Sequence, residues 1–142
     1  MDSDYEDLTE CGLSDELEQK LLYGHRECVF MWTNQAGEAF GVVHAYLAKD
    51  GKIWMTAAER RKRIRAIRRF PRASACINGT GSPVGGGKTV NYKSNCLVRD
   101  DRETKDWFYP EFARHLNPEN APDYKLSFDG SLMWARSPGV RG

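Results

Sequence analysis

Two apolar runs separated by a short polar turn open the first half of the chain. They span residues 28–33 and 39–47, and the turn between them, 34–38, contains a glycine that can adopt positive φ. Asp50-Gly51 then signals a two-residue hairpin, and residues 52–56 are the next strand-like run. The pattern therefore predicts a β-meander.

Helical spacing replaces the strand pattern in three places. Ser14 is a predicted cap for a helix over 15–23, whose leucines share one face. At Thr56 the sequence Thr56-Ala57-Ala58-Glu59 fits a capping box, and a helix continues from it with Ile64 and Ile67 toward a core until Pro71 ends it. A third helix is predicted from residue 102 or 103 to 116.

The remaining segments complete a mainly β fold. Strands are predicted at 73–78, 89–98 and 124–128, with a glycine-rich loop at 79–87. About six hairpin-linked strands with one helix crossing midway suggest a small antiparallel barrel, closed or half closed, with flanking helices. Residues 132–138 are assigned to a tail.

Composition fits one globular domain. The chain has 142 residues, of which 40% are hydrophobic, and it holds no apolar run long enough to cross a membrane. We expect a flexible acidic segment over 1–12 and a single cofactor-binding domain over 13–142. The acidic start is unlike a signal peptide, so we expect a cytoplasmic protein.

The cysteines and histidines do not have the spacing of a metal site. No C-x-x-C motif occurs, and no histidine stands at zinc spacing from a cysteine, so no metal is predicted. Cys28, Cys76 and Cys96 lie in strand-like surroundings and are interpreted as reduced, structural thiols. His44 is a lone strand histidine, interpreted as packing in a core or against a cofactor.

Charge is distributed unevenly along the chain. Residues 1–18 hold eight acids and no base, whereas residues 57–70 hold seven bases against Glu59. A basic helix of this kind concentrates positive potential and attracts anions. Three interpretations remain open: a solvated helix face, a nucleic-acid contact, or a site for a phosphorylated cofactor.

The sequence 82–89 resembles a phosphate-binding loop, but its first glycine is misplaced and strand residues follow it, so a hairpin loop is favoured.

The order of strands, the Asp-Gly hairpin, the strand ending in Thr56 and the basic helix before Pro71 resembles the pyridoxamine-phosphate-oxidase-like family. These proteins are flavin- or deazaflavin-binding split barrels, and the resemblance covers about residues 13–116. It implies a homodimer with the cofactor in the dimer groove. It also implies that a phosphate-gripping triplet lies at Arg61, Lys62 and Arg63, or one residue earlier from Arg60. Thr56 and Ala57 would lie beside the ribityl chain, and three strand residues would line the isoalloxazine edge: Val42, Val43 and His44.

The chain also departs from the pyridoxamine phosphate oxidases proper. Val42 stands where they carry an arginine, and residues 132–138 lack their Trp- and Arg/His-rich signature. The short, arginine-rich form looks more like the reductases that use deazaflavin (coenzyme F420), and Arg65, Arg68, Arg69 and Arg72 would bind its anionic tail. We therefore expect an oxidoreductase that uses F420 or FMN on a small organic substrate. No catalytic residue is assigned, because the cofactor ring performs hydride transfer. The alternatives are a non-catalytic flavin-binding module and, as an outsider, a basic nucleic-acid-binding domain.

Overall fold

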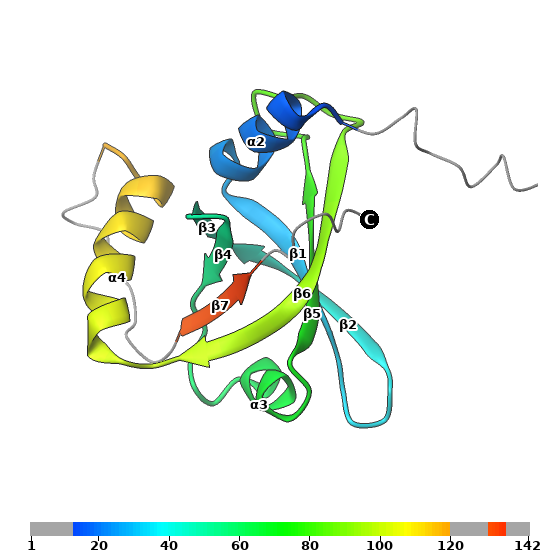
Figure 1. The fold of residues 1–142 in the computed structure, drawn as a ribbon, viewed down its shortest axis with the longest axis vertical. Helices are drawn as coiled ribbons and strands as arrows, with labels where there is room; N and C mark the ends of the chain where they lie inside the picture. The colour runs from blue at the N-terminus through cyan, green and yellow to red at the C-terminus, as the bar shows by residue number, and fades with distance from the viewer. Residues whose placement is uncertain (1–12, 120–130, 136–142) are drawn as a thin grey trace, which may run out of the picture.

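A computed structural model describes residues 13–119 and 131–135 of the chain (Figure 1). Its elements follow in the order α2 (Asp15–Gly24), β1 (Glu27–Thr33), β2 (Ala39–Ala45), β3 (Leu47–Lys49), β4 (Lys52–Met55), α3 (Lys62–Arg69), β5 (Arg72–Asn78), β6 (Thr89–Arg99), α4 (Arg102–Leu116) and β7 (Ser131–Ala135). The prediction of a mainly β fold with flanking helices is confirmed.

One antiparallel sheet contains all seven described strands, in the order β2-β1-β5-β6-β7-β4-β3. The long strand β6 joins its two halves, because residues 89–95 pair with β5 and residues 96–99 pair with β7. Among the described strands, β2 and β3 do not pair with each other. The barrel is therefore split rather than closed, and the closed form that the sequence also allowed is wrong.

The sequence analysis missed a strand over residues 131–135. Residues 131–135 form β7 between β4 and β6, although we had assigned most of them to a tail. Their sequence is too short and too evenly apolar to show strand alternation. The predicted strand at 124–128 and the predicted flexible segment at 1–12 lie outside the described residues.

Alternating burial along the strands builds the main core. Phe30, Ala75 and Tyr92 face inward and are fully buried, as their positions in β1, β5 and β6 require. Helix α2 is capped by Ser14, as predicted, and covers one end of this core. The Tyr46 hydroxyl donates a hydrogen bond to the Leu22 carbonyl at 2.6 Å, which fastens α2 to the sheet.

The capping box predicted at Thr56 does not form. Helix α3 begins at Lys62, and its N-cap Arg61 makes no side-chain capping bond. The hydroxyl of Thr56 instead bonds that of Tyr109, and Glu59 pairs with Arg68 in the last turn of α3. Tertiary partners thus outcompete the local cap and leave residues 56–61 as a connector, which we call the strap. Ile64 and Ile67 do face the core, as predicted.

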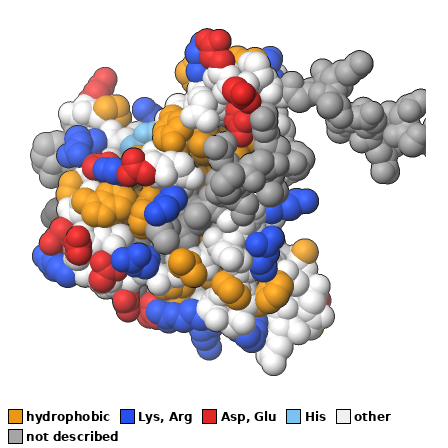
Figure 2. Space-filling view, in the orientation of Figure 1, with side chains coloured by type: hydrophobic (Ala, Val, Ile, Leu, Met, Phe, Trp, Pro, Cys, Tyr) orange, Lys and Arg blue, Asp and Glu red, His pale blue; other side chains and the backbone are white. Residues whose placement is uncertain are grey.

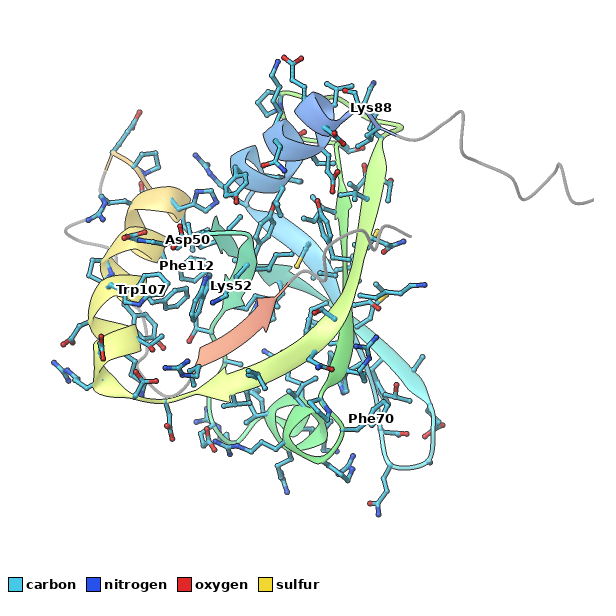
Figure 3. All side chains as sticks on the ribbon, in the orientation of Figure 1. Asp50, Lys52, Phe70, Lys88, Trp107 and Phe112 are labelled. Carbon is cyan, nitrogen blue, oxygen red and sulfur yellow. The ribbon has the colours of Figure 1, made fainter. Side chains whose placement is uncertain are left out.

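A second hydrophobic cluster attaches α4 to the β3–β4 hairpin. It consists of buried side chains from both elements: Leu47, Trp54, Phe108, Tyr109 and Phe112. Trp107 meets Trp54 edge to face at 4.7 Å, and Lys49 lies over the Trp107 ring and pairs with Glu111 at 2.5 Å. Figure 3 shows Trp107 and Phe112 beside the hairpin that carries Asp50 and Lys52. This cluster brings α4 next to the strap.

The glycine-rich loop is a hairpin connection, as the sequence indicated. It joins the antiparallel strands β5 and β6, and no helix follows it. Lys88 lies at the end of the molecule opposite Phe70, which directly follows α3 (Figure 3). The loop therefore has neither the helix nor the neighbours of a phosphate-binding loop.

The thiols fit the structural role that we expected, with one exception. Cys28 and Cys96 are buried, and burial raises the pKa of each thiol to about 12. Cys76 is only half-buried and lies on the outer face of the sheet.

Across the residues described, no helix is both long and apolar enough to cross a bilayer.

Candidate functional site

A groove of about 550 Å³ lies between the β1–β2 hairpin and helix α3, and we call it the α3 groove. Its apolar surface includes Trp32, Phe40 and Ala66, and its cations are Lys62, Arg65 and Arg69. A cavity of this size holds a small molecule or cofactor. Figure 2 shows Lys and Arg side chains gathered along the lower edge of the molecule, where Figure 1 places α3.

The aromatic surface of the groove continues a stack that begins in the core. Trp32 and Phe40 face each other across β1 and β2, with ring centroids 5.9 Å apart and planes 15° apart. Phe30 also stacks on Trp32, with ring centroids 5.7 Å apart. Exposure rises from 0% at Phe30 to 47% at Phe40. The inner ring thus supports the outer ones and leaves a flat aromatic side chain accessible.

The basic side of the groove follows from helical spacing. Residues 62, 65, 66 and 69 are three or four positions apart, so they form one stripe on α3. In the part of the chain that the structure describes, none of the three cations on this stripe pairs with a carboxylate, whereas Arg68 on another face pairs with Glu59. Three uncompensated cations beside an apolar surface favour an anionic ligand that also carries a flat apolar part.

Local hydrogen bonds fix the tip of the hairpin that forms the opposite wall. The Asn34 side chain donates to the Glu38 carboxylate and accepts from the Glu38 backbone N–H, both at 2.9 Å. Gly37 turns the chain with φ of +84°, a conformation that favours glycine. The wall is therefore built without a ligand.

A second charged feature lies on the buried side of α3. Arg63 is half-buried and its Nε has no hydrogen-bond partner among the described residues, while burial and the neighbouring Arg61 lower its pKa. The same environment reaches His44, whose pKa is lowered by burial and by Arg63 against a backbone hydrogen bond. Its Nδ1 lies 3.0 Å from the Ala45 carbonyl oxygen, so Nδ1 carries the proton, and Nε2 is an acceptor with no partner in the described part of the chain. His44 is therefore a neutral imidazole at pH 7.

The remaining residues suggested by the resemblance are spread over several surfaces. Strand alternation turns Val42 and His44 inward and Val43 outward, where it is 65% exposed. Ala57 is buried, and Thr56 is half-buried against Tyr109. Of the predicted triplet, Lys62 alone is among the residues that line the α3 groove.

The arginines expected to bind a long anionic tail also separate. Arg65 and Arg69 line the α3 groove, but Arg68 is held by Glu59. Arg72 donates to Asn95 at 3.2 Å and borders an adjoining cavity of about 280 Å³ with Lys93. Trp32 lines both cavities, so the two basic surfaces meet at this side chain.

Sequence reasoning missed Trp32 and Phe40 as site residues. Both flank the 34–38 turn at equal distance, which places them opposite each other in any hairpin closed by that turn. That symmetry was a usable signal. The contact of these two rings with α3 could not be predicted from the sequence, because it depends on how the helix packs across the sheet.

Comparison with known proteins finds the same fold. No family model and no curated protein matches the sequence. Among solved structures, a conserved hypothetical protein of Mycobacterium tuberculosis superposes with a TM-score of 0.73 at 13% identity, covering 91% of this chain and 82% of that one. An FAD-binding protein of Mesorhizobium loti gives 0.66 at 17% identity over 88% and 91% of the two chains. An F420 reductase gives 0.62 at 12% identity over 92% and 98%.

The chain therefore shares the split-barrel fold of these solved structures. The family resemblance drawn from the sequence is thus confirmed at the level of the fold. In this split barrel the α3 groove lies at the helix that carries the predicted phosphate-binding triplet, which connects the fold to the chemistry of the site.

Proposed function

We propose that this split barrel binds a flavin-type cofactor, F420 or FMN, and is an oxidoreductase acting on a small organic substrate. The observation that carries the proposal is the α3 groove, where Lys62, Arg65 and Arg69 lie beside the Trp32–Phe40 stack and pair with no carboxylate of the described residues. Its cations suit the phosphate of the cofactor, and the head of α3 adds Arg61 and Arg63. When bound, such a cofactor supplies hydride transfer through its ring.

The strap and strand β2 support the rest of the proposed site. Thr56 and Ala57 precede the cations along the chain, which suits a ribityl chain that leads to a phosphate. Among the described strands β2 pairs with β1 alone, so the backbone of Val42, Val43 and His44 has an unpaired edge. That edge offers hydrogen bonds to the polar rim of the cofactor ring, although the three side chains alternate between the two faces.

Binding and turnover test this function separately. Titration of the full chain with F420 and with FMN should give one cofactor per protomer, and the reduced cofactor should then reduce an unsaturated acceptor. Binding without turnover on a broad panel of acceptors would favour a non-catalytic flavin module. Binding to nucleic acid with neither cofactor bound would overturn the proposal in favour of the basic-domain alternative.

Salt dependence should distinguish the two cofactors. FMN has one phosphate, whereas F420 adds carboxylates that can extend from Arg65 and Arg69 toward Arg72 and Lys93. These outer contacts are exposed and therefore screened by salt. We propose F420 as the cofactor and expect its dissociation constant to rise more steeply with ionic strength than that of FMN. Equal slopes, or tighter binding of FMN at 0.15 M salt, would contradict this choice.

We also propose that the protein is a homodimer through the outer face of β2-β1-β5-β6. Val43 and Val29 are directly opposite each other there and are 65% and 38% exposed, next to the half-buried Cys76. Exposed apolar residues gathered on a sheet face favour burial against a partner. Light scattering should show a dimer, which Val43→Glu should convert to a monomer. The control Gln19→Glu adds the same charge on α2 and should remain dimeric.

A further inference from the structure

Tyr109 connects helix α4 to the strap that leads into the basic helix. Its hydroxyl lies 2.6 Å from Oγ1 of Thr56, a bond between residues 53 positions apart. The Tyr109 side chain is 3% exposed and packs against Phe108 at 5.1 Å in the second hydrophobic cluster. Because the ring is fixed by packing, the position of its hydroxyl is fixed as well.

Two further contacts involve the strap, one within it and one to α3. The Arg61 N–H donates to the Ala58 carbonyl at 2.9 Å, and Glu59 pairs with Arg68. Both of these contacts lie within the strap and the helix that follows it. The contact from Tyr109 is made by a separate element, α4, so it ties the strap to the second hydrophobic cluster, while Ala57 packs in the main core.

We propose that Tyr109 is a positioning residue for the cofactor site. By holding the Thr56 hydroxyl, it fixes the course of the strap and therefore the place of Lys62, which directly follows the strap and lines the α3 groove. A site held in place before the ligand arrives binds more tightly, because less ordering is required on binding. The inference rests on the proposed function, which places Thr56 and Lys62 along one bound cofactor.

The test compares two tyrosines that each lose one buried hydroxyl. Tyr109→Phe removes the bond to Thr56 and retains the ring. Tyr46→Phe is the matched control, since the Tyr46 hydroxyl is equally buried but donates to the Leu22 carbonyl on the far side of the core. Both variants should unfold at somewhat lower denaturant concentration than wild type. Affinity is then measured by titration at a temperature where circular dichroism shows all three proteins folded.

The probes are FMN and F420. Each is compared with an analogue that keeps its ring system and lacks the phosphate group. We expect Tyr109→Phe to weaken binding of the tighter phosphorylated cofactor about fivefold to tenfold, the size of one hydrogen bond. The loss should be smaller for the form without phosphate, because Lys62 then has no anion to meet. Tyr46→Phe should bind like wild type.

Three results would overturn the inference. The first is wild-type affinity in Tyr109→Phe, and the second is an equal loss in Tyr46→Phe, which would reveal a general effect of lower stability. The third is an equal loss with and without the phosphate group. If wild type itself bound neither FMN nor F420, the proposed function would fail first, and this inference with it.

Discussion

Replacing Lys62 and Arg65 together with glutamine should weaken cofactor binding about 100-fold. Each charge-assisted hydrogen bond to a phosphate contributes about 1.5–3 kcal/mol, and partial exposure places these two near the lower end. The free energy of unfolding should change little, because both side chains are exposed and neither pairs with a carboxylate in the described part of the chain. Titration with F420 and FMN, with denaturant unfolding in parallel, measures both quantities.

A matched control comes from the same helix. Arg68→Gln removes one positive charge from a side chain that Glu59 already holds outside the α3 groove, so affinity should fall less than threefold, the scale of a screened distant charge. The pair Arg61→Gln and Arg63→Gln tests the register suggested by the sequence. If that pair abolished binding while Lys62 and Arg65 proved dispensable, the phosphate would lie on the buried side of α3 and our placement would be wrong.

The second large effect should come from the inner ring of the aromatic stack. Phe30→Ala should lower the free energy of unfolding by about 3–5 kcal/mol, since it empties a fully buried site in the main core. Denaturant unfolding followed by tryptophan fluorescence measures this loss. Should the variant not fold, Phe30→Leu is a milder replacement, for which about 1–2 kcal/mol is expected.

Phe40 is the matched position at the outer end of the stack. Because it is 47% exposed, Phe40→Ala should change stability by less than about 1 kcal/mol but remove part of the groove surface. We expect it to weaken binding of the cofactor several-fold. A pattern in which Phe40→Ala were as destabilising as Phe30→Ala would show that the stack belongs wholly to the core and does not serve the groove.

How far the sequence could be interpreted depended on whether a signal was local. The hairpins, the caps at Ser14 and the inward-facing Ile64 and Ile67 follow from turn chemistry and periodicity, and they were predicted. The capping box at Thr56 was wrong, because Tyr109, 53 residues away, bonds Thr56, and Arg68, at the far end of α3, pairs with Glu59. Local spacing cannot weigh such partners.

The candidate site shows the same division. Lys62 was predicted as a site residue because it belongs to a run of bases that is visible in the sequence, and it lines the α3 groove. Trp32 and Phe40 were missed, because they become part of a site only where α3 packs beside the hairpin. Val42, Val43 and His44 were treated as one wall, although strand geometry sends neighbours to opposite faces.

The position of β7 in the sheet has a consequence for the order in which the protein can assemble. Residues 131–135 leave the ribosome after every other described strand, yet they lie between β4 and β6. Until they arrive, β4 and residues 96–99 of β6 present backbone edges with no strand between them. The nascent chain can complete the half built from β1, β2, β5 and β6 earlier, whereas the β3–β4 hairpin joins the sheet last. Stalled or shortened chains would therefore expose two unpaired, aggregation-prone strand edges on one side of an otherwise assembled sheet.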